Sequence, residues 1–220
     1  PSRQLCPLHP AMAPSAFAVA ALVTAASWAH SAVADCSVES VAKLRTNRVA
    51  TEFEPKGMEG FWYEHAYIDP AQMGASCPTL NAKVDNATGE IATDFSVLYS
   101  AVPFTIKEYY EPVEPAVNGV YKKHVQIPFG IPGGSLVQLP TAIVDAQMSK
   151  DGSRYETLIM YSCWATPLAT VRELVVATRS PEVDHAVLKA MLQTARERGV
   201  EFEESSVSFV DRAQCSSSSS

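Results

Sequence analysis

The sequence predicts an all-β domain of about eight antiparallel strands followed by a single helix. Segments in which apolar and polar residues alternate recur at short intervals, and a period of two indicates strands that bury one face. Clusters of turn residues, such as 85–89, separate these segments. A helical spacing appears only near the C-terminus. Eight sequential strands can stack as a sandwich or close as a barrel, and the alternation does not distinguish the two.

Each strand is predicted from its own pattern of residues. The first is rich in aromatic side chains, which strands favour, and the third, 91–99, carries its apolar residues at every second position. The turn at 149–152 predicts a hairpin between the sixth and seventh strands. The predicted strands are 61–68, 79–84, 91–99, 104–110, 120–127, 136–146, 155–163 and 171–178.

Helical patterns are confined to the two ends of the domain. A weakly amphipathic stretch over 37–51 predicts a short helix or coil before the first strand. After the last strand, apolar residues recur at spacings of three and four from Val187 to Ala195. Asp184 can cap the start of this helix, and Gly199 can end it. A short extended piece, 207–210, follows.

Residues 1–34 have the character of a secretory signal peptide. The stretch 14–29 is apolar or small, and Ala32-Val33-Ala34 provides the small-x-small pattern that a signal peptidase accepts. The apolar run is about 16 residues, shorter than the roughly 20 that a membrane-spanning helix needs. A membrane anchor is therefore the less favoured alternative. We expect cleavage after Ala34, one exported domain over 35–215, and a low-complexity serine tail over 216–220.

Loss of the signal would also account for the odd number of cysteines, which is five. Cys6 would leave with the signal, and Cys36, Cys77, Cys163 and Cys215 would remain. Four cysteines in an exported domain predict two disulfide bonds, for which three pairings are possible. Four buried thiols are the alternative.

Composition and motifs exclude several classes of function. The 17 Lys and Arg residues against 24 Asp and Glu give a net charge of −7, which argues against binding nucleic acid or anionic lipid. His65, His124 and His185 lack the spacing of metal ligands, and the sequence has neither a phosphate-binding glycine loop nor a nucleophile elbow. We therefore expect no metal, no cofactor, no nucleic-acid partner and no membrane span after signal removal.

Five segments in the same order together resemble the lipocalin family. They match the Gly-x-Trp-Tyr signature, the second and third strands, the seventh strand, the eighth strand with its arginine, and the terminal cysteine segment. These segments are Gly60–Tyr63, 77–93 (CPTLNAKVDNATGEIAT), 155–163 (YETLIMYSC), 174–181 (LVVATRSP) and 211–215 (DRAQC). The resemblance is greatest to apolipoprotein D and the bacterial lipocalins. It implies an eight-stranded up-and-down barrel with the C-terminal helix packed outside.

The chain departs from the family pattern in its middle. Where lipocalins have Thr-Asp-Tyr near the end of strand six, this chain has Val144-Asp145-Ala146. The proline-containing loops 111–116 and 127–134 are also unusual, and we expect them to flank the barrel mouth.

The resemblance assigns structural roles to several residues. Trp62, in the signature that Gly60 begins, would close the barrel floor, and Arg179 would pack across its indole ring. Such a cation–π contact contributes roughly 0.5–2 kcal/mol. The resemblance also implies the disulfide pairs Cys36–Cys163 and Cys77–Cys215.

The implied function is the binding and transport of a small hydrophobic ligand, such as a lipid, retinoid or carotenoid, inside the barrel. Glu64 lies two residues from Trp62 and therefore points inward, either as a polar anchor for the ligand or as the partner of a basic side chain at the floor. The lining is expected to be apolar with a few hydroxyl groups, and a filled core is the alternative. Its other expected members are Phe95, Val97, Tyr99, Ile106, Tyr121, Val125 and Ile143.

Two other functions remain open at this point. One is a lipocalin-fold enzyme acting on a lipid or carotenoid, an isomerase with a free Cys77 thiol or a protein similar to a de-epoxidase. The other is a sandwich-type adhesion module without a cavity. Asn86-Ala87-Thr88 is a sequon for N-glycosylation on a predicted turn. We expect secretion, with an organelle lumen such as that of the thylakoid as the alternative.

Overall fold

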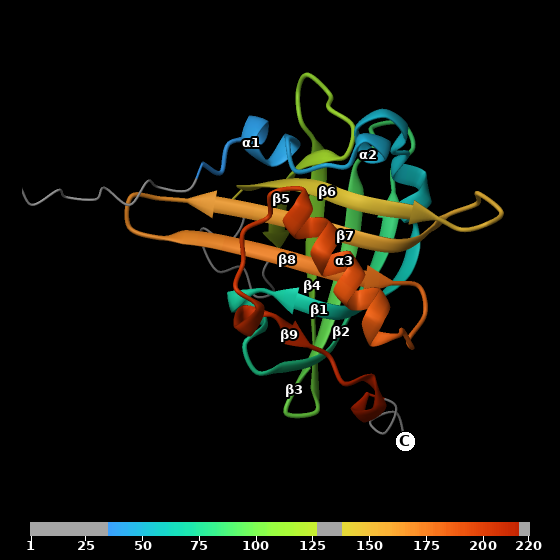
Figure 1. Cartoon of the computed structure of the whole chain (residues 1–220), viewed down its shortest axis with the longest axis vertical. Helices are drawn as coiled ribbons and strands as arrows, with labels where there is room; N and C mark the ends of the chain where they lie inside the picture. The colour runs from blue at the N-terminus through green and yellow to red at the C-terminus, as the bar shows by residue number, and fades with distance from the viewer. Residues whose placement is uncertain (1–34, 127–137, 216–220) are drawn as a thin grey trace, which may run out of the picture. The chain divides into compact units, whose positions relative to one another are not determined.

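A closed antiparallel β-barrel forms the body of the domain (Figure 1). The computed structural model describes residues 35–126 and 138–215. The predicted signal peptide, the predicted loop 127–134 and the serine tail lie outside the described residues. The barrel strands are β1 (Gly60–Ile68), β2 (Ala75–Val84), β3 (Ile91–Tyr99), β4 (Val102–Pro112), β5 (Val120–Gln126), β6 (Gln138–Met148), β7 (Tyr155–Ala165) and β8 (Thr170–Thr178).

Each barrel strand pairs with the next one in the chain, and β1 closes the ring. Its residue Trp62 lies opposite Leu80 of β2, while Ile68 lies opposite Leu174 of β8. This closure confirms the barrel and excludes the sandwich, because a sandwich would leave edge strands in each of its two sheets.

Strand β1 changes neighbour halfway along its length. Residues 60–63 pair with β2, whereas Ala66 and Tyr67 pair with the short strand β9 (Ser208–Phe209). A bulge between Glu64 and Ala66 marks the change on the β8 side. The C-terminal segment therefore completes the wall where β1 and β2 separate.

Two apolar clusters lie on opposite faces of the curved sheet. The inner cluster contains Trp62, Phe95 and Leu158, and the outer cluster contains Ile159 and Val176. Alternate residues of one strand thus enter different clusters, as the period of two requires. Residues 141–146 of β6, 158–163 of β7 and 174–178 of β8 are buried on both faces, which accounts for the mainly apolar sequence of these stretches.

The C-terminal helix covers the outer face of the barrel. Helix α3 (His185–Glu197) begins at the predicted cap, where the Asp184 carboxylate accepts a hydrogen bond from the amide of Ala186. It ends before Gly199, whose φ of +94° favours glycine. The helix contacts β6 and β8. The side chains that it buries are Leu188, Met191, Leu192 and Ala195.

The remaining helical elements are short. The predicted helix or coil over 37–51 consists of two helices, α1 (Val38–Ala42) and α2 (Asn47–Glu52), capped by Ser37 and Thr46. The other turns of helix are η1 (Pro55–Met58), η2 (Pro70–Gln72), η3 (Glu204–Ser206) and η4 (Arg212–Gln214).

Two disulfide bonds attach both chain ends to the barrel. Cys36 bonds to Cys163 of β7, and Cys77 of β2 bonds to Cys215. These are the pairs that the resemblance implies. The sequence separations are 127 and 138 residues, for which the chain-entropy model gives a stabilisation of about 4–5 kcal/mol per bond.

Replacing both cysteines of one pair by serine should therefore lower the free energy of unfolding by up to about 4–5 kcal/mol, because the unfolded chain regains its freedom. Urea titration of Cys36→Ser/Cys163→Ser, compared with Cys77→Ser/Cys215→Ser, measures this effect. Losses below about 1 kcal/mol in both double variants would contradict it.

Candidate functional site: the barrel interior

Trp62 and Arg179 seal one end of the barrel. The Trp62 side chain is fully buried, and its indole N–H donates to the carbonyl of Met58 at 2.9 Å. The Arg179 guanidinium lies 3.7 Å from the centre of the indole ring. Burial lowers the pKa of Arg179 to about 10, so the side chain is still charged at neutral pH. The expected floor of the barrel is therefore present.

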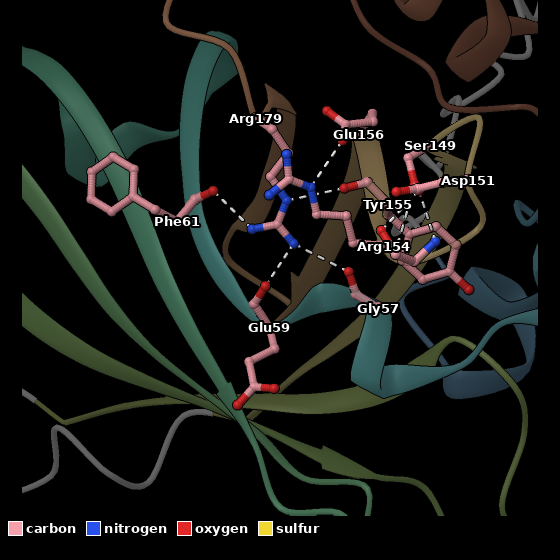
Figure 2. Close-up of polar contacts among 10 residues, drawn as sticks. Gly57, Glu59, Phe61, Ser149, Asp151, Arg154, Tyr155, Glu156 and Arg179 are labelled. Carbon is pink, nitrogen blue, oxygen red and sulfur yellow. Dashed lines mark hydrogen bonds and ion pairs between the residues drawn. The ribbon is translucent and has the colours of Figure 1, made fainter.

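Arg179 holds this end together through backbone carbonyl groups. Figure 2 shows its guanidinium between η1, β1 and β7. It donates hydrogen bonds to the carbonyls of Gly57, Glu59, Phe61 and Tyr155 at 2.8–3.1 Å. Gly60 permits this approach, because a Cβ atom there would lie 3.3 Å from the Arg179 side chain and its φ is +100°.

The N-terminal segment packs across the same end. The Phe53 ring stacks on Tyr155 with 5.3 Å between centroids, and the Tyr155 hydroxyl accepts from the amide of Glu54. Asp145, in the motif that departs from the family pattern, accepts from Thr46 and from Arg48 at 2.7 Å. The aspartate of that motif thus anchors α2.

The connection between β4 and β5 also lies at the closed end. Arg45 donates to the carbonyl of Asn118, and a Cβ at Gly119 would meet the side chain of Val49. The expectation that loop 111–116 flanks the barrel mouth is therefore wrong. Successive connections alternate between the ends of an up-and-down barrel, so the connection after β4 lies at the same end as the one after β2.

Inward-facing side chains of the described residues are exposed toward the opposite end of the barrel, which we call the open end. Side chains on the inward face of β4 become more exposed toward the turn that joins it to β3. Tyr110 is 3% exposed and Glu108 5%, Ile106 is partly buried, Phe104 is 37% exposed, and Val102 is 64% exposed. Among the described residues, the inward face of β4 is therefore most exposed near the turn that joins it to β3.

The structure places the predicted apolar lining residues on the inner wall. Four of them belong to the buried inner cluster: Phe95, Val97, Tyr121 and Ile143. Tyr99 and Ile106 are partly buried and pack against that cluster. Val125 is partly buried and shares the face of Tyr121 on β5.

The interior also holds charged residues that the sequence reasoning missed. The Lys123 ammonium lies 2.8 Å from the Glu108 carboxylate and 2.8 Å from the Glu173 carboxylate. The Lys123 side chain is 6% exposed. The Tyr110 hydroxyl donates to Glu108 at 2.7 Å, and Thr93 donates at 3.4 Å. The prediction of a lining made only of apolar residues and hydroxyl groups therefore left out these charged residues.

Burial and mutual attraction oppose each other in this cluster. Burial alone would lower the pKa of Lys123, but the two neighbouring carboxylates outweigh it and hold the pKa well above its ordinary value. Burial raises the pKa of Glu173, against the attraction of Lys123. Burial, together with the charge of Glu108, raises the pKa of Tyr110. Lys123 is therefore a fixed cation inside the wall.

A signal for these residues was present in the alternation. Lys123 lies between Tyr121 and Val125 on β5, two residues from each, so the period of two directs it inward. The same holds for Glu108, which lies between Ile106 and Tyr110 on β4, and for Glu173, which lies between Val171 and Val175 on β8.

Glu64 is buried in the interior as expected, at 1% exposure. Its carboxylate accepts a hydrogen bond from the amide nitrogen of Gln72 at 3.1 Å. No Lys or Arg nitrogen among the described residues lies within 4.0 Å of it. Burial raises the pKa of Glu64 to about 8, with smaller contributions from Glu108 and Asp69. The carboxyl is thus largely protonated at neutral pH.

Gln72 reaches Glu64 from the connection between β1 and β2. It ends η2, which is tied to β3 by a hydrogen bond of 2.7 Å from the Tyr99 hydroxyl to the carbonyl of Ala71. The Gln72 side-chain oxygen is buried and has no hydrogen-bond partner in the described part of the chain. Sequence reasoning missed Gln72, because η2 has no repeating pattern.

The described residues offer few groups for catalysis. Their four cysteines form the two disulfides, so Cys77 has no free thiol. Within residues 35–126 and 138–215, His, Cys, Asp and Glu side chains do not gather in groups of three that could hold a metal ion. In the same ranges, no helix is both long enough and apolar enough to cross a membrane.

The barrel with its outer helix has the fold of lipocalins. Apocrustacyanin C1 matches with a TM-score of 0.55 and 14% identity, over 81% of this chain and 87% of that chain. Insecticyanin from the tobacco hornworm, Manduca sexta, matches with a TM-score of 0.53 and 14% identity, over 73% and 81%. The siderocalin Ex-FABP, described as functioning through dual ligand specificities, matches with a TM-score of 0.51 and 12% identity, over 70% and 93%.

At these identities the likeness shows the fold alone. No model of a known protein family matches the chain, and no curated protein sequence matches it. The resemblance to apolipoprotein D and the bacterial lipocalins stays a prediction.

Replacing Arg179 by methionine should lower the free energy of unfolding by about 2–4 kcal/mol, because four backbone carbonyls at the closed end lose a charged donor and Trp62 loses its cation–π contact. Urea titration monitored by tryptophan fluorescence measures the change. Arg154→Met is the matched control, since Arg154 is exposed and pairs with Glu156 on the surface (Figure 2). Equal effects of the two substitutions would contradict the assigned role of Arg179.

Replacing Lys123 by methionine should lower the free energy of unfolding by about 3–5 kcal/mol, because two buried carboxylates lose their cation. The triple variant Lys123→Met/Glu108→Gln/Glu173→Gln should recover much of this loss, since no unpaired charge remains. Thermal and urea unfolding of both variants provide the measurement. A single variant as stable as the native protein would show that the ion cluster is not buried as described.

Proposed function

We propose that this chain is an exported member of the lipocalin family that binds and carries a small, mainly apolar ligand in its barrel. The observation that carries the proposal is the difference between the two barrel ends. One end is sealed by Trp62 and Arg179, and inward-facing aromatic and aliphatic side chains become exposed toward the other. A solvent-accessible apolar wall above a closed floor suits a ligand that is poorly soluble in water.

The ligand would contact the inner wall from the floor toward the open end. Burial of its apolar surface contributes roughly 25 cal/mol per Å², before the entropy lost on binding is subtracted. The solved structures with this fold support the proposal, since one of them is described by its ligand specificities. The proposed contact residues are Glu64, Phe95, Val97, Tyr99, Ile106, Tyr121, Val125 and Ile143.

Export is part of the proposal. It is supported by the signal-like residues 1–34 and by two disulfide bonds, which persist in oxidising compartments. Asn86 is exposed in the turn between β2 and β3, at the closed end. We propose that it carries a glycan, which at that position would leave the open end free. The isomerase alternative is less favoured, because the Cys77 thiol that it needs is bonded to Cys215.

Solvent extraction of the purified native protein, followed by mass spectrometry, should find a bound apolar molecule. Retinol or oleic acid should also quench the fluorescence of Trp62 in a Trp164→Phe variant, where Trp62 is the only tryptophan of the domain. Ile106→Arg should weaken the binding of uncharged retinol at least tenfold, because it places a charge on the inner wall near the opening. Thr105→Arg, on the outward face of the same strand, should change affinity less than twofold.

Failure to extract any apolar molecule, together with the absence of quenching by either probe, would overturn the proposed function. Equal weakening by Ile106→Arg and Thr105→Arg would show that the probes bind outside the barrel.

A further inference from the structure

We propose that the ligand ends in a protonated amine, which binds inside the barrel against Glu64 and the side-chain oxygen of Gln72. This inference rests on the proposed function and deepens it, because it names the chemistry of the polar end of the ligand. It is carried by the hydrogen-bonding groups of the interior and by the balance of their charges.

The first observation is an unused acceptor. The side-chain amide of Gln72 is buried, and its N–H group donates a hydrogen bond of 3.1 Å to the Glu64 carboxylate. Its side-chain oxygen has no hydrogen-bond partner among the described residues. A buried acceptor without a donor costs about 1–3 kcal/mol. Ionised Glu64 also offers acceptors only. Once Glu64 is ionised, its carboxylate and the free Gln72 oxygen are both acceptors, and an ammonium group supplies three donors.

The second observation is an excess of carboxyl groups over amino groups among the described residues of the inner wall. Three carboxyl groups, Glu64, Glu108 and Glu173, lie on the inner wall with one ammonium group, that of Lys123. Lys123 contacts Glu108 and Glu173 directly at 2.8 Å, and Glu64 has no such contact. An entering cation would reduce this imbalance, whereas an entering carboxylate would increase it.

The charged groups around Glu64 do not supply that cation themselves. Glu108 of β4 and Asp69 beside η2 disfavour its ionisation, and Lys123 of β5 favours it too weakly to prevent protonation. Arg212 of η4 approaches Glu64 but donates to its backbone carbonyl at 2.6 Å instead of its carboxylate. Desolvation dominates, and the pKa of Glu64 rises to about 8 in the empty barrel.

Binding of the amine has a defined proton balance. In the empty barrel near pH 7, Glu64 is a neutral carboxylic acid, and the free ligand is an ammonium ion. When the ammonium binds beside Glu64, its charge lowers the pKa of the carboxyl, which ionises and releases its proton to solvent. The complex then contains a carboxylate–ammonium pair, and one proton appears in solution for each ligand bound.

A chain-length series tests the chemistry of the polar end. Dodecylamine, dodecanol and dodecanoic acid, each below its micelle concentration, are titrated into the disulfide-bonded protein at pH 7 in a calorimeter. The amine should bind at least tenfold more tightly than the alcohol and the acid. Titrations in buffers of different ionisation enthalpy should show about one proton released per amine.

Substitutions identify the groups responsible. Glu64→Gln should weaken amine binding at least tenfold, abolish the proton release and change alcohol binding less than twofold. Glu156→Gln, a surface carboxyl at the closed end, is the matched control and should alter none of these values. Gln72→Met, which removes the free acceptor but keeps the shape, should weaken amine binding several-fold and provides the test if Glu64→Gln does not fold.

The outcomes separate this inference from the proposed function. If none of the three compounds binds while retinol still quenches Trp62 fluorescence, this inference is overturned and the proposed function stands; if retinol, oleic acid and solvent extraction also fail, both are overturned. If the alcohol or acid binds as tightly as the amine, or if the amine binds without dependence on Glu64 and Gln72, the proposed function stands and this inference is overturned.

Discussion

Closure of the sheet through β1 is the constraint on which the rest of the structure depends. Because β1 pairs with both β2 and β8, each strand has an inside and an outside, and alternate residues enter two separate clusters. Arg179 then fixes the closed end, since its guanidinium reaches carbonyls of η1, β1 and β7 while it covers Trp62. The open end, the outer helix and the interior site are all defined relative to this ring.

The interior combines an apolar wall with groups that are costly to bury. An entirely apolar lining would be at least as stable, since buried ion pairs seldom repay the loss of their hydration. The chain nevertheless places Lys123 between Glu108 and Glu173 and leaves Glu64 without a cation. Such an arrangement favours discrimination between ligands, because each unpaired group penalises a molecule that does not match it.

Alternation predicted the strands well because each one buries a face, and β3 (Ile91–Tyr99) has the expected bounds. The helix cap at Asp184 could also be predicted, because it depends only on residues next to it in the sequence. Some strands are longer than predicted. Strand β4 begins at Val102 and not at residue 104, because its first inward residues are exposed and the alternation of buried and exposed positions is lost there. The position of loop 111–116 could not be read locally, because the end of the barrel to which it belongs is set by closure.

The candidate site was less predictable than the fold. The inward position of Glu64 followed from Trp62, and the same rule of alternation places Lys123, between Tyr121 and Val125, on the inner face. Gln72 could not be found, because its position depends on how η2 folds back onto the barrel and not on any periodicity.

The change of neighbour along β1 gives the barrel wall a seam. Beyond Glu64, β1 and β2 are no longer joined directly, and two residue pairs with β9 complete this part of the wall. The Cys77–Cys215 bond fastens β2 to the segment that follows β9. Local opening requires least free energy where the fewest backbone hydrogen bonds are broken, so the seam is where the wall is easiest to part. Reduction of this one cystine would remove the covalent tie across the seam.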